Sequence, residues 1–187
     1  EACHQAEVKQ KDVAQALAQA KNEQLYEACK CEKESDLAKV IKALEVDGVD
    51  VNYKGDAFFP YVCGRPARRD NDGGRTSLIW ASTNGHIDIV RHLLSVKGIQ
   101  VNQARDDGAT ALYMASQNGH VEVVRLLLGV EGVEVNQVDK NGVTSLLIAS
   151  QKGHVEVVRL PLGVEGVEVN QADNDGGTAA LIAALKN

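Results

Sequence analysis

The chain has 187 residues, of which 44% are hydrophobic and 4% aromatic, and its formal net charge is −6. This length suffices for one domain or one short solenoid, and the low aromatic content fits thin layers packed from small aliphatic side chains. The negative charge, without a long run of lysine or arginine, argues against nucleic acid as a partner. No apolar run approaches the roughly 18 residues that a membrane-spanning helix needs.

The four cysteines are too few and too irregularly spaced for a secreted disulfide scaffold: Cys3, Cys29, Cys31 and Cys63. They indicate reduced thiols inside a cell, with the cytoplasm as the expected compartment. One spacer residue between two cysteines, without a second pair or a nearby histidine, is a weak metal signal, so we expect no metal and no cofactor. The chain begins at Glu1 rather than Met, which favours a processed product or a fragment of a longer protein. An organelle reached after removal of a targeting segment is therefore the alternative compartment.

Residues 1–23 are expected to form an N-terminal helix or extension. The segment from Gln5 to Ala20 lacks Gly and Pro and is rich in Ala, Gln and Lys, so we predict a helix whose Val13 and Leu17 face the rest of the protein. Residues 24–52 then show two short helical patterns and end in Val51-Asn52. The apolar positions of these patterns are Leu25, Tyr26 and Ala28, followed by Leu37, Val40, Ile41 and Leu44.

Residues 53–70 are expected to be an inserted loop. The interval from Asn52 to Gly74 is about 16 residues longer than the matching interval from Asn102 to Gly108, and long loops carry either function or disorder. Aromatic residues and arginine, which are enriched at binding hot spots, gather here. Either they bind a partner, or the two phenylalanines fold back onto the array as a satellite core. The residues are Tyr53, Phe58, Phe59, Tyr61, Arg65, Arg68 and Arg69.

From residue 71 onward the sequence repeats with a period of 34 residues. Glycine recurs at Gly74, Gly108, Gly142 and Gly176, each followed two residues later by threonine, at Thr76, Thr110, Thr144 and Thr178. Gly-His pairs recur at Gly85-His86, Gly119-His120 and Gly153-His154, and asparagine closes the units at Asn102, Asn136 and Asn170. A fixed period in this range predicts stacked units that bury their apolar faces only against their neighbours.

Each unit is predicted to consist of a turn, a helix, a second turn, a second helix and a loop. In the unit that starts at Gly108, Thr110 can cap the first helix and Gly119 can end it in the left-handed conformation. Val121, Val124, Leu127 and Leu128 follow at helical spacing and are expected to form a second apolar face. The predicted helices are 76–84, 87–95, 110–118, 121–128, 144–152, 155–160 and 178–186.

These motifs resemble the ankyrin repeat. The matching stretches read Gly-Arg-Thr-Ser-Leu-Ile-Trp-Ala from Gly74, Gly-Ala-Thr-Ala-Leu-Tyr-Met-Ala from Gly108 and Gly-Val-Thr-Ser-Leu-Leu-Ile-Ala from Gly142. The resemblance covers residues 71–187, as three full units and one half unit, and more weakly residues 24–52, which would form a divergent capping repeat. It implies an all-α solenoid with β-turn tips. The family's proline after threonine is replaced here by Ser77, Ala111, Ser145 and Ala179, which loses some preorganisation of the helix start.

The resemblance also implies a contact surface, because ankyrin domains usually bind partners through their turn tips and inner helix ends. Plain solvent exposure is the alternative for the short polar side chains, and Tyr113 suits a core as well as a contact. Together with the insertion residues Phe58, Phe59, Tyr61, Arg65, Arg68 and Arg69, the candidate contacts are Thr83, Asn84, Asp106, Tyr113, Gln117, Asn118, Lys140, Gln151 and Lys152.

Several other periodic residues are expected to be structural. The histidines His86, His120 and His154 lie one unit apart, roughly 10 Å, which is too far to share a metal ion, so we expect them to bond backbone between units. Trp80 aligns with apolar residues of later units and is expected in the core between units.

The outer helices carry Asp88 with Arg91, Glu122 with Arg125 and Glu156 with Arg159 at i, i+3 spacing. These are expected to be solvated pairs, with recognition of a charged partner as the alternative. Pro161, which replaces the leucine of the preceding unit, is expected to be a local helix defect.

No nucleophile–base pair, phosphate loop or carboxylate pair is present, so we predict a non-enzymatic protein-binding module, or scaffold. The alternative is a structural or linker subunit of a larger complex. The half unit that ends at Asn187 would leave an apolar face uncovered, which suggests more chain or a neighbouring subunit. A regulated enzyme would need a catalytic domain outside these residues.

Overall fold

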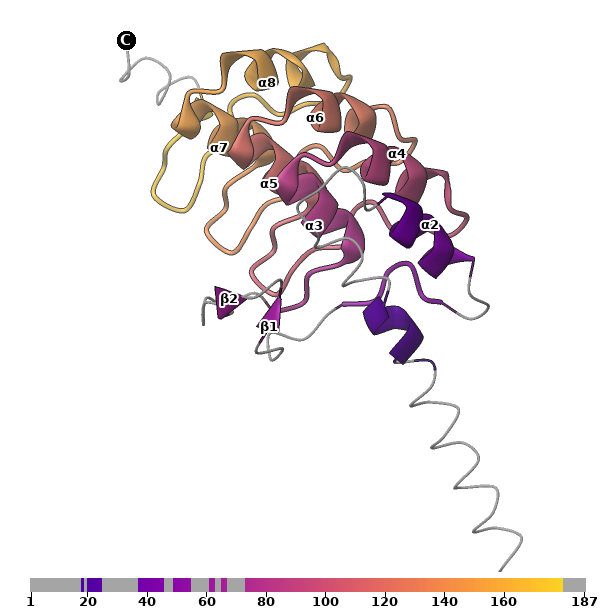
Figure 1. Cartoon of the computed structure of the whole chain (residues 1–187). Helices are drawn as coiled ribbons and strands as arrows, with labels where there is room; N and C mark the ends of the chain where they lie inside the picture. Colours follow the sequence, from indigo (N-terminus) through magenta and orange to yellow (C-terminus); the bar gives the residue numbers. More distant parts are fainter. Residues whose placement is uncertain are drawn as a thin grey trace, which may run out of the picture.

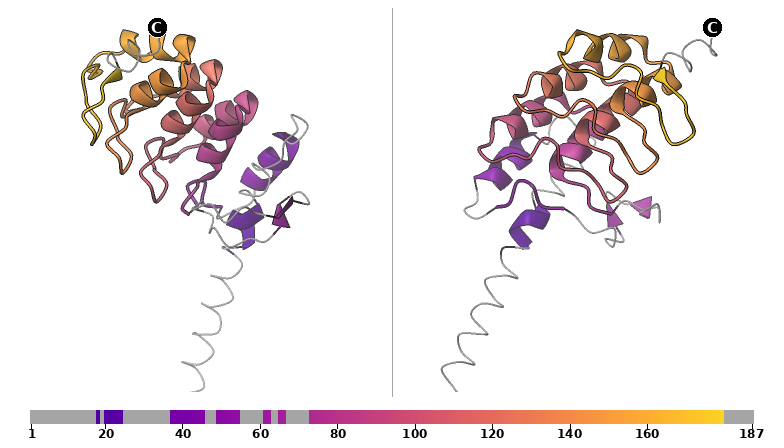
Figure 2. Two further views of the ribbon diagram at one scale, coloured as in Figure 1. Left: turned by 90° about the vertical axis from the view of Figure 1, so that its left-hand side faces the viewer. Right: turned by 180° about the vertical axis from the view of Figure 1, so that it is seen from behind.

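The computed structural model describes residues 18, 20–24, 37–45, 49–54, 61–62, 65–66 and 73–179. Short helices stack side by side in two rows, and long loops project together from one side of the stack (Figures 1 and 2). The inner row contains α3 (Ser77–Asn84), α5 (Ala111–Asn118) and α7 (Ser145–Lys152). The outer row contains α2 (Leu37–Leu44), α4 (Ile87–Ser95), α6 (Val121–Leu128) and α8 (Val155–Arg159).

The six predicted helices between residues 76 and 160 are confirmed to within one residue at each end. Their starts follow from the repeated threonine: the side chains of Thr76, Thr110 and Thr144 accept a hydrogen bond from the N–H three residues on. The inner helices end at glycines with positive φ, such as Gly119 at +77°. The predicted helix at 178–186 lies almost wholly outside the described residues.

The core lies between the two rows and between successive units. The units contribute equivalent and mostly aliphatic positions, and the fully buried side chains of the array include Leu78, Leu93, Val124, Leu127 and Leu147. Because each layer contacts only its neighbours, the core is a continuous ribbon along the stack rather than a single centre. Within the described residues, no helix is long and apolar enough to span a bilayer.

Side-chain amides join each unit to the next at the closing loops. Asn102 donates from Nδ2 to the Gly132 carbonyl (2.7 Å) and accepts from the Glu134 N–H at Oδ1 (2.9 Å). Asn136 makes the same two bonds to Gly166 and Glu168, 2.8 and 2.9 Å. One asparagine therefore satisfies a donor and an acceptor of the neighbouring loop, which would otherwise need water.

Asn52 makes the same pair of bonds, to the Gly98 carbonyl and the Gln100 N–H, at 2.9 and 2.7 Å. The segment that ends at Asn52 is thus stacked in register on the next unit despite the insertion between them. Its outer helix α2 covers the residues expected to be helical. The residues expected on the first helix of that segment lie outside the described part of the chain.

Histidines provide a second link between units. The ring Nε2 of His120 donates to the Thr83 carbonyl (2.9 Å), and that of His154 donates to the Gln117 carbonyl (3.0 Å). A carbonyl can only accept, so both rings carry their proton on Nε2. The expected imidazole-to-backbone role is confirmed for these two rings. The Nε2 atom of His86 is buried without a hydrogen-bond partner among the described residues.

The two remaining segments are described only in part. Residues 18 and 20–24 are helical, whereas Val13 and Leu17 lie outside the described residues. Within the insertion, β1 (Tyr61–Val62) pairs antiparallel with β2 (Arg65–Pro66), Tyr61 opposite Pro66. The sequence did not predict this short hairpin. Nothing is described of the side chains of Tyr61 and Arg65, and Phe58, Phe59, Arg68 and Arg69 lie outside the described residues.

Pro161 shortens the last outer helix. Residues 120–137 and 154–171 are identical except that Leu127 is replaced by Pro161, yet α6 extends over eight residues and α8 over five. A 3₁₀ turn at Pro161–Gly163 follows, because proline has no N–H to continue the ladder. The local defect expected at Pro161 is present.

Replacing Pro161 with leucine is therefore expected to extend α8 and raise the free energy of unfolding by about 1 kcal/mol, less than the roughly 3 kcal/mol of a mid-helix proline. Proline also restricts the unfolded chain, which offsets part of this gain. The measurement is thermal and urea unfolding of the full chain. An unchanged or lowered midpoint would contradict the defect interpretation.

Candidate protein-binding surface

The ends of the inner helices present short polar side chains held by their own helix. Asn84 and Asn118, both exposed, donate from Nδ2 to the carbonyls of Trp80 and Met114, each at 2.9 Å. Thr83 likewise donates to the Ile79 carbonyl (2.7 Å). These bonds fix the three side chains and leave the amide oxygens of the two asparagines out of the bonds to their own helix. Such fixed acceptors lose little entropy when a partner binds.

The loop tips form a second row, and each tip lies just before the N-terminus of an inner helix. Backbone bonds connect neighbouring tips: the Lys140 N–H donates to the Asp107 carbonyl (2.8 Å), and the Asn174 N–H donates to the Asn141 carbonyl (2.9 Å). Within a tip, Asp139 Oδ1 accepts from the N–H groups of Asn141 and Val143, both at 2.9 Å. The tips are thus braced internally and to each other, and the exposed side chains of Asp106 and Lys140 stand on this frame.

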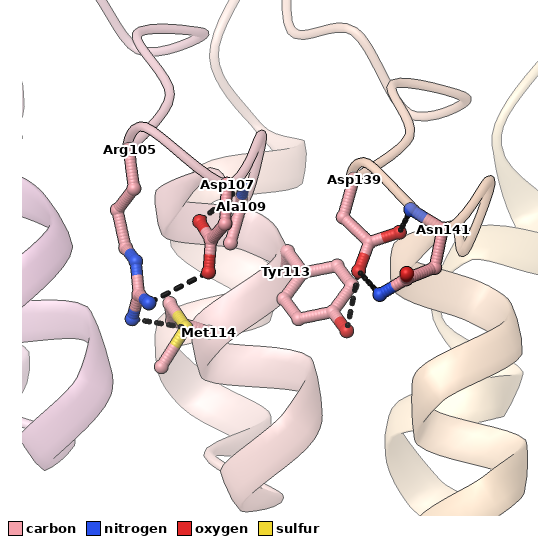
Figure 3. Close-up of polar contacts among 7 residues, drawn as sticks. All are labelled: Arg105, Asp107, Ala109, Tyr113, Met114, Asp139 and Asn141. Atoms are coloured by element: carbon pink, nitrogen blue, oxygen red, sulfur yellow. Dashed lines mark hydrogen bonds and ion pairs between the residues drawn. The ribbon is translucent and has the colours of Figure 1, made fainter. Parts of the chain in front are cut away.

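The tip that contains Arg105 and Asp107 is braced by different side chains from the next two tips (Figure 3). Arg105 stands where the next two units have Asp139 and Asp173. Asp107 takes over the aspartate's task by accepting the Ala109 N–H (3.1 Å), and it pairs with Arg105 across 2.6 Å. The Arg105 side chain is only 11% exposed and also contacts the Met114 sulfur at 3.9 Å. Burial and pairing keep the Arg105 charge away from an incoming partner.

Tyr113 belongs to the core. The sequence had left open whether this side chain is buried or contacts a partner. It is 8% exposed, and its hydroxyl donates to Asp139 Oδ2 of the next unit at 3.5 Å (Figure 3). Asn141 Nδ2 donates to the same carboxylate oxygen (3.2 Å). Tyr113 therefore connects an inner helix to the neighbouring tip, and little of its side chain is left to contact a partner.

Burial, reinforced by the negative charge of Asp139, raises the pKa of Tyr113 to about 12. The folded pKa exceeds the unfolded value near 10, so the neutral phenol contributes stability that is complete below pH 10 and is lost as the pH rises from about 10 to 12. By linkage the loss is up to roughly 2–3 kcal/mol.

The Tyr113→Phe variant has no group to ionise at this site. The unfolding free energy of the wild type, relative to that of the variant, should therefore fall between pH 9 and pH 12. Denaturant unfolding of both proteins across this range measures the difference. A difference independent of pH would show that the phenol ionises as freely in the folded state as in the unfolded chain.

The remaining candidates divide between surface and structure. Gln117 and Gln151 are partly exposed at the inner helix ends, and Lys152 is exposed beside Gln151. Trp80, expected in the core, is only partly buried, and the Arg75 guanidinium lies 4.9 Å from its ring centroid. The described candidates other than Tyr113 therefore fall into two groups, one at the C-terminal ends of the inner helices and one at the loop tips that precede the N-termini of these helices. In the described part of the chain, no three His, Cys, Asp or Glu side chains gather in a possible metal site.

The outer helices present ion pairs to solvent on the other side of the stack. Arg159 Nη1 lies 2.9 Å from Glu156, and Arg125 Nε lies 3.6 Å from Glu122, with all four side chains more than half exposed. These two expected solvated pairs are confirmed. Asp88 and Arg91, although both described and exposed, form no ion pair.

Sequence reasoning missed the exchange of roles between Arg105 and Asp107. The signal was present, because arginine replaces a repeated aspartate while a second aspartate appears two residues on. It also missed the hydrogen bonds between neighbouring tips, because these join backbone groups and do not require a particular residue type.

Comparison with protein families identifies the array. A profile of three ankyrin repeats matches residues 25–139, and a single ankyrin repeat matches residues 141–174. No curated protein matched the chain in a sequence search. Since the matched residues cover most of the sequence, the chain belongs to the ankyrin repeat family.

Proposed function

We propose that this chain is a non-catalytic module that binds a partner protein through its inner helix ends, its loop tips and the insertion at residues 53–70. Ankyrin repeats are generally protein-interaction modules, and this supports the general class. Protein is favoured over nucleic acid because the net charge is −6. An intracellular location is part of the proposal and rests on the cysteine pattern.

The proposal rests mainly on which positions keep the same residue type in successive units and which do not. Buried positions repeat: Leu78, Leu112 and Leu146 occupy equivalent sites. The tip position differs in all three units, as Asp106, Lys140 and Asn174. At the inner helix ends one unit of three differs at each position, with Thr83 against Gln117 and Gln151, and Lys152 against Asn84 and Asn118. A surface that varies on a repeating frame can be specific for one partner without disturbing the fold.

The variant Asn118→Ala/Lys140→Glu/Lys152→Glu tests this surface, because it truncates one side chain and reverses the charge of two others. The immobilised full chain should retain a partner from cell extract, identified by mass spectrometry, and the variant should retain at least tenfold less because its contact residues are truncated or reversed. Circular dichroism and the unfolding midpoint should hardly change, since all three side chains are at the surface.

The matched control is Arg125→Glu/Arg159→Glu on the outer helices, whose side chains are about as exposed. It should retain the partner. If both variants retained equally little partner, the loss of binding would be due to the change in net charge. This result would contradict the assignment of the contact to the inner surface.

The insertion is the second part of the proposed surface, with Phe58, Phe59, Tyr61, Arg65, Arg68 and Arg69 as its candidate contacts. Its support is compositional, because aromatic residues and arginine are enriched at hot spots. The Phe58→Ala/Phe59→Ala variant should lose the partner while its unfolding midpoint stays nearly unchanged. If the unfolding midpoint of the variant fell strongly while the variant still retained the partner, the insertion would be part of the core and not a contact surface.

A structural or linker subunit of a larger assembly is the second candidate. The last described unit favours it, because Val155 on α8 is 60% exposed and Leu162, in the 3₁₀ turn that follows, is 49% exposed. A purely structural role predicts that the inner-surface variant assembles normally, whereas variants of Val155 and Leu162 do not.

A further inference from the structure

Three asparagines of this chain are followed by a glycine: Asn84, Asn118 and Asn141. In such a pair the peptide nitrogen of the glycine can attack the side-chain amide carbon of the asparagine, because glycine has no side chain to hinder the approach. The asparagine then loses its amide nitrogen and becomes an acid. All three pairs lie in the described part of the chain, and their surroundings differ.

Two of these pairs end an inner helix. The Asn84 and Asn118 amides donate to carbonyls of their own helices, both at 2.9 Å, and the N–H groups of the glycines that follow donate to helix carbonyls as well. A helix also directs each side chain back toward its N-terminus, away from the next peptide nitrogen. The last turn of the helix must therefore unwind before the nitrogen of the glycine can reach the asparagine side chain.

Asn141 lies in a loop tip instead, and it is exposed. Its Nδ2 donates to Asp139 Oδ2 at 3.2 Å (Figure 3), and the Gly142 N–H donates to the Asp139 carbonyl at 3.0 Å. Both bonds end on Asp139, so a local opening of this one turn frees the amide and the attacking nitrogen together. No helix has to unwind.

Gly142 is held in place by the neighbouring tip. Its φ is +77°, a conformation that strains residues with a side chain, and an added Cβ would lie 2.7 Å from Asn174 Oδ1. The position therefore requires glycine, which is the residue that hinders attack on Asn141 least.

The two neighbouring tips already carry the acid at the equivalent position, as Asp107 and Asp175. Asp175 follows Asp173 as Asn141 follows Asp139, and the two turns are alike. Oδ1 of Asp173 accepts two N–H groups of its own turn, at 3.1 and 2.7 Å, and Oδ1 of Asp139 accepts the equivalent two, both at 2.9 Å. An aspartate at position 141 is therefore compatible with the tip.

We propose that Asn141 is a site of spontaneous deamidation, selected from the three Asn-Gly pairs by its place in a loop tip. The Gly142 nitrogen gives up its proton and bonds to Cγ of Asn141, while the bond from Cγ to Nδ2 breaks and Nδ2 leaves with that proton as ammonia. Water then opens the cyclic imide at one of its two carbonyl carbons, which yields aspartate or isoaspartate. The only co-reactant is water, and one molecule of ammonia is released for each molecule of water consumed.

The reaction changes the charge of the tip. Asp139 and Lys140 carry opposite charges, and the amide of Asn141 is neutral. A carboxylate at position 141 makes the tip negative and removes the donor that binds Asp139 Oδ2. It also stands next to Lys140, an exposed candidate contact, so an acidic partner is attracted less. This effect on binding rests on the proposed function, whereas the reaction itself does not.

Peptide mapping of the full chain tests the proposal without any partner. The chain is incubated at mildly alkaline pH and digested with trypsin, which cuts after Lys and Arg and so places the three pairs in separate peptides, residues 76–91, 106–125 and 141–152. Mass spectrometry should find that peptide 141–152 converts to its acid forms at least about fivefold faster than the other two, the factor that one further hydrogen bond supplies. A digest at time zero corrects for conversion during digestion.

The same chain unfolded in urea provides the intrinsic rates. There all three pairs are free of structure, so the preference for Asn141 should disappear. The Asn141→Asp chain is the matched reference. It should elute with the aspartate product on anion exchange, and its peptide 141–152 should not convert further.

Three results would overturn the proposal. Equal or faster conversion of Asn84 or Asn118 in the folded chain would show that the tip does not select Asn141. Conversion in urea without conversion of Asn141 in the folded chain would show that the bonds to Asp139 protect the amide. A preference for Asn141 that persists in urea would assign the selectivity to the sequence rather than to the fold. Loss or retention of a partner plays no part in these results, so failure here is distinct from failure of the proposed binding surface.

Discussion

Replacing Leu112 with alanine is expected to lower the free energy of unfolding by about 2–5 kcal/mol. Leu112 lies on α5, the central inner helix, which packs against α3 and α7, and it is 3% exposed. Truncation removes its transfer free energy and leaves a cavity that the stacked neighbours cannot easily close. Because the core is a ribbon one layer thick, no other residues can compensate for the missing side chain.

The measurement is equilibrium unfolding in urea, with Leu162→Ala as the matched control. Leu162 is 49% exposed on the last unit, so its truncation should cost less than about 1 kcal/mol. Equal losses at the two positions would mean that stability does not follow burial in this array. A negligible loss at Leu112 would place the wrong face of α5 in the core.

The helices were predictable because each unit repeats the same local signals. Thr110 caps α5 and Gly119 ends it in the left-handed conformation, and both residues recur with the period of the array. These signals act within a few residues of chain, so residue type alone specifies them. Even the local exception was visible, since Pro161 marked the shortened α8 before its geometry was known.

Contacts between units were predictable only where periodicity and chemistry coincided. The bonds of His120 and His154 to backbone were expected because the spacing ruled out a shared metal ion. The burial of Tyr113 was undecided, since it depends on Asp139 in the next unit. Asn22, which accepts the Asp50 N–H, was not noticed at all, because it lies outside the repeating segment and its role appears only from the loop it caps.

The insertion resists sequence analysis for a related reason. Each position of the array recurs in other units, where the same signal can be compared, whereas residues 53–70 have no second copy in the chain. The pairing of β1 with β2 was not signalled by a glycine-containing two-residue turn of the usual hairpin type.

Gly119→Ala is the second change with a large expected effect, about 2–4 kcal/mol of lost stability. Gly119 has φ of +77°, where alanine is strained by roughly 1–2 kcal/mol. The added Cβ would also lie 2.8 Å from Nδ1 of His154. The ring must therefore move, and its 3.0 Å bond to the Gln117 carbonyl is weakened or lost.

Gly153→Ala separates these two contributions. Gly153 has nearly the same φ, +78°, but a Cβ there meets nothing within 4 Å among the described residues. Its substitution should therefore cost only the backbone strain, about 1–2 kcal/mol. The difference between the two variants, measured by urea unfolding, then reports the packing of one unit's histidine against the preceding turn. If both variants lose the same stability, the histidine contact contributes little, and the glycines recur only for their backbone conformation. If Gly119→Ala loses more and the additional His154→Ala change removes that excess, the glycine is required because the next unit's imidazole occupies the space of a side chain.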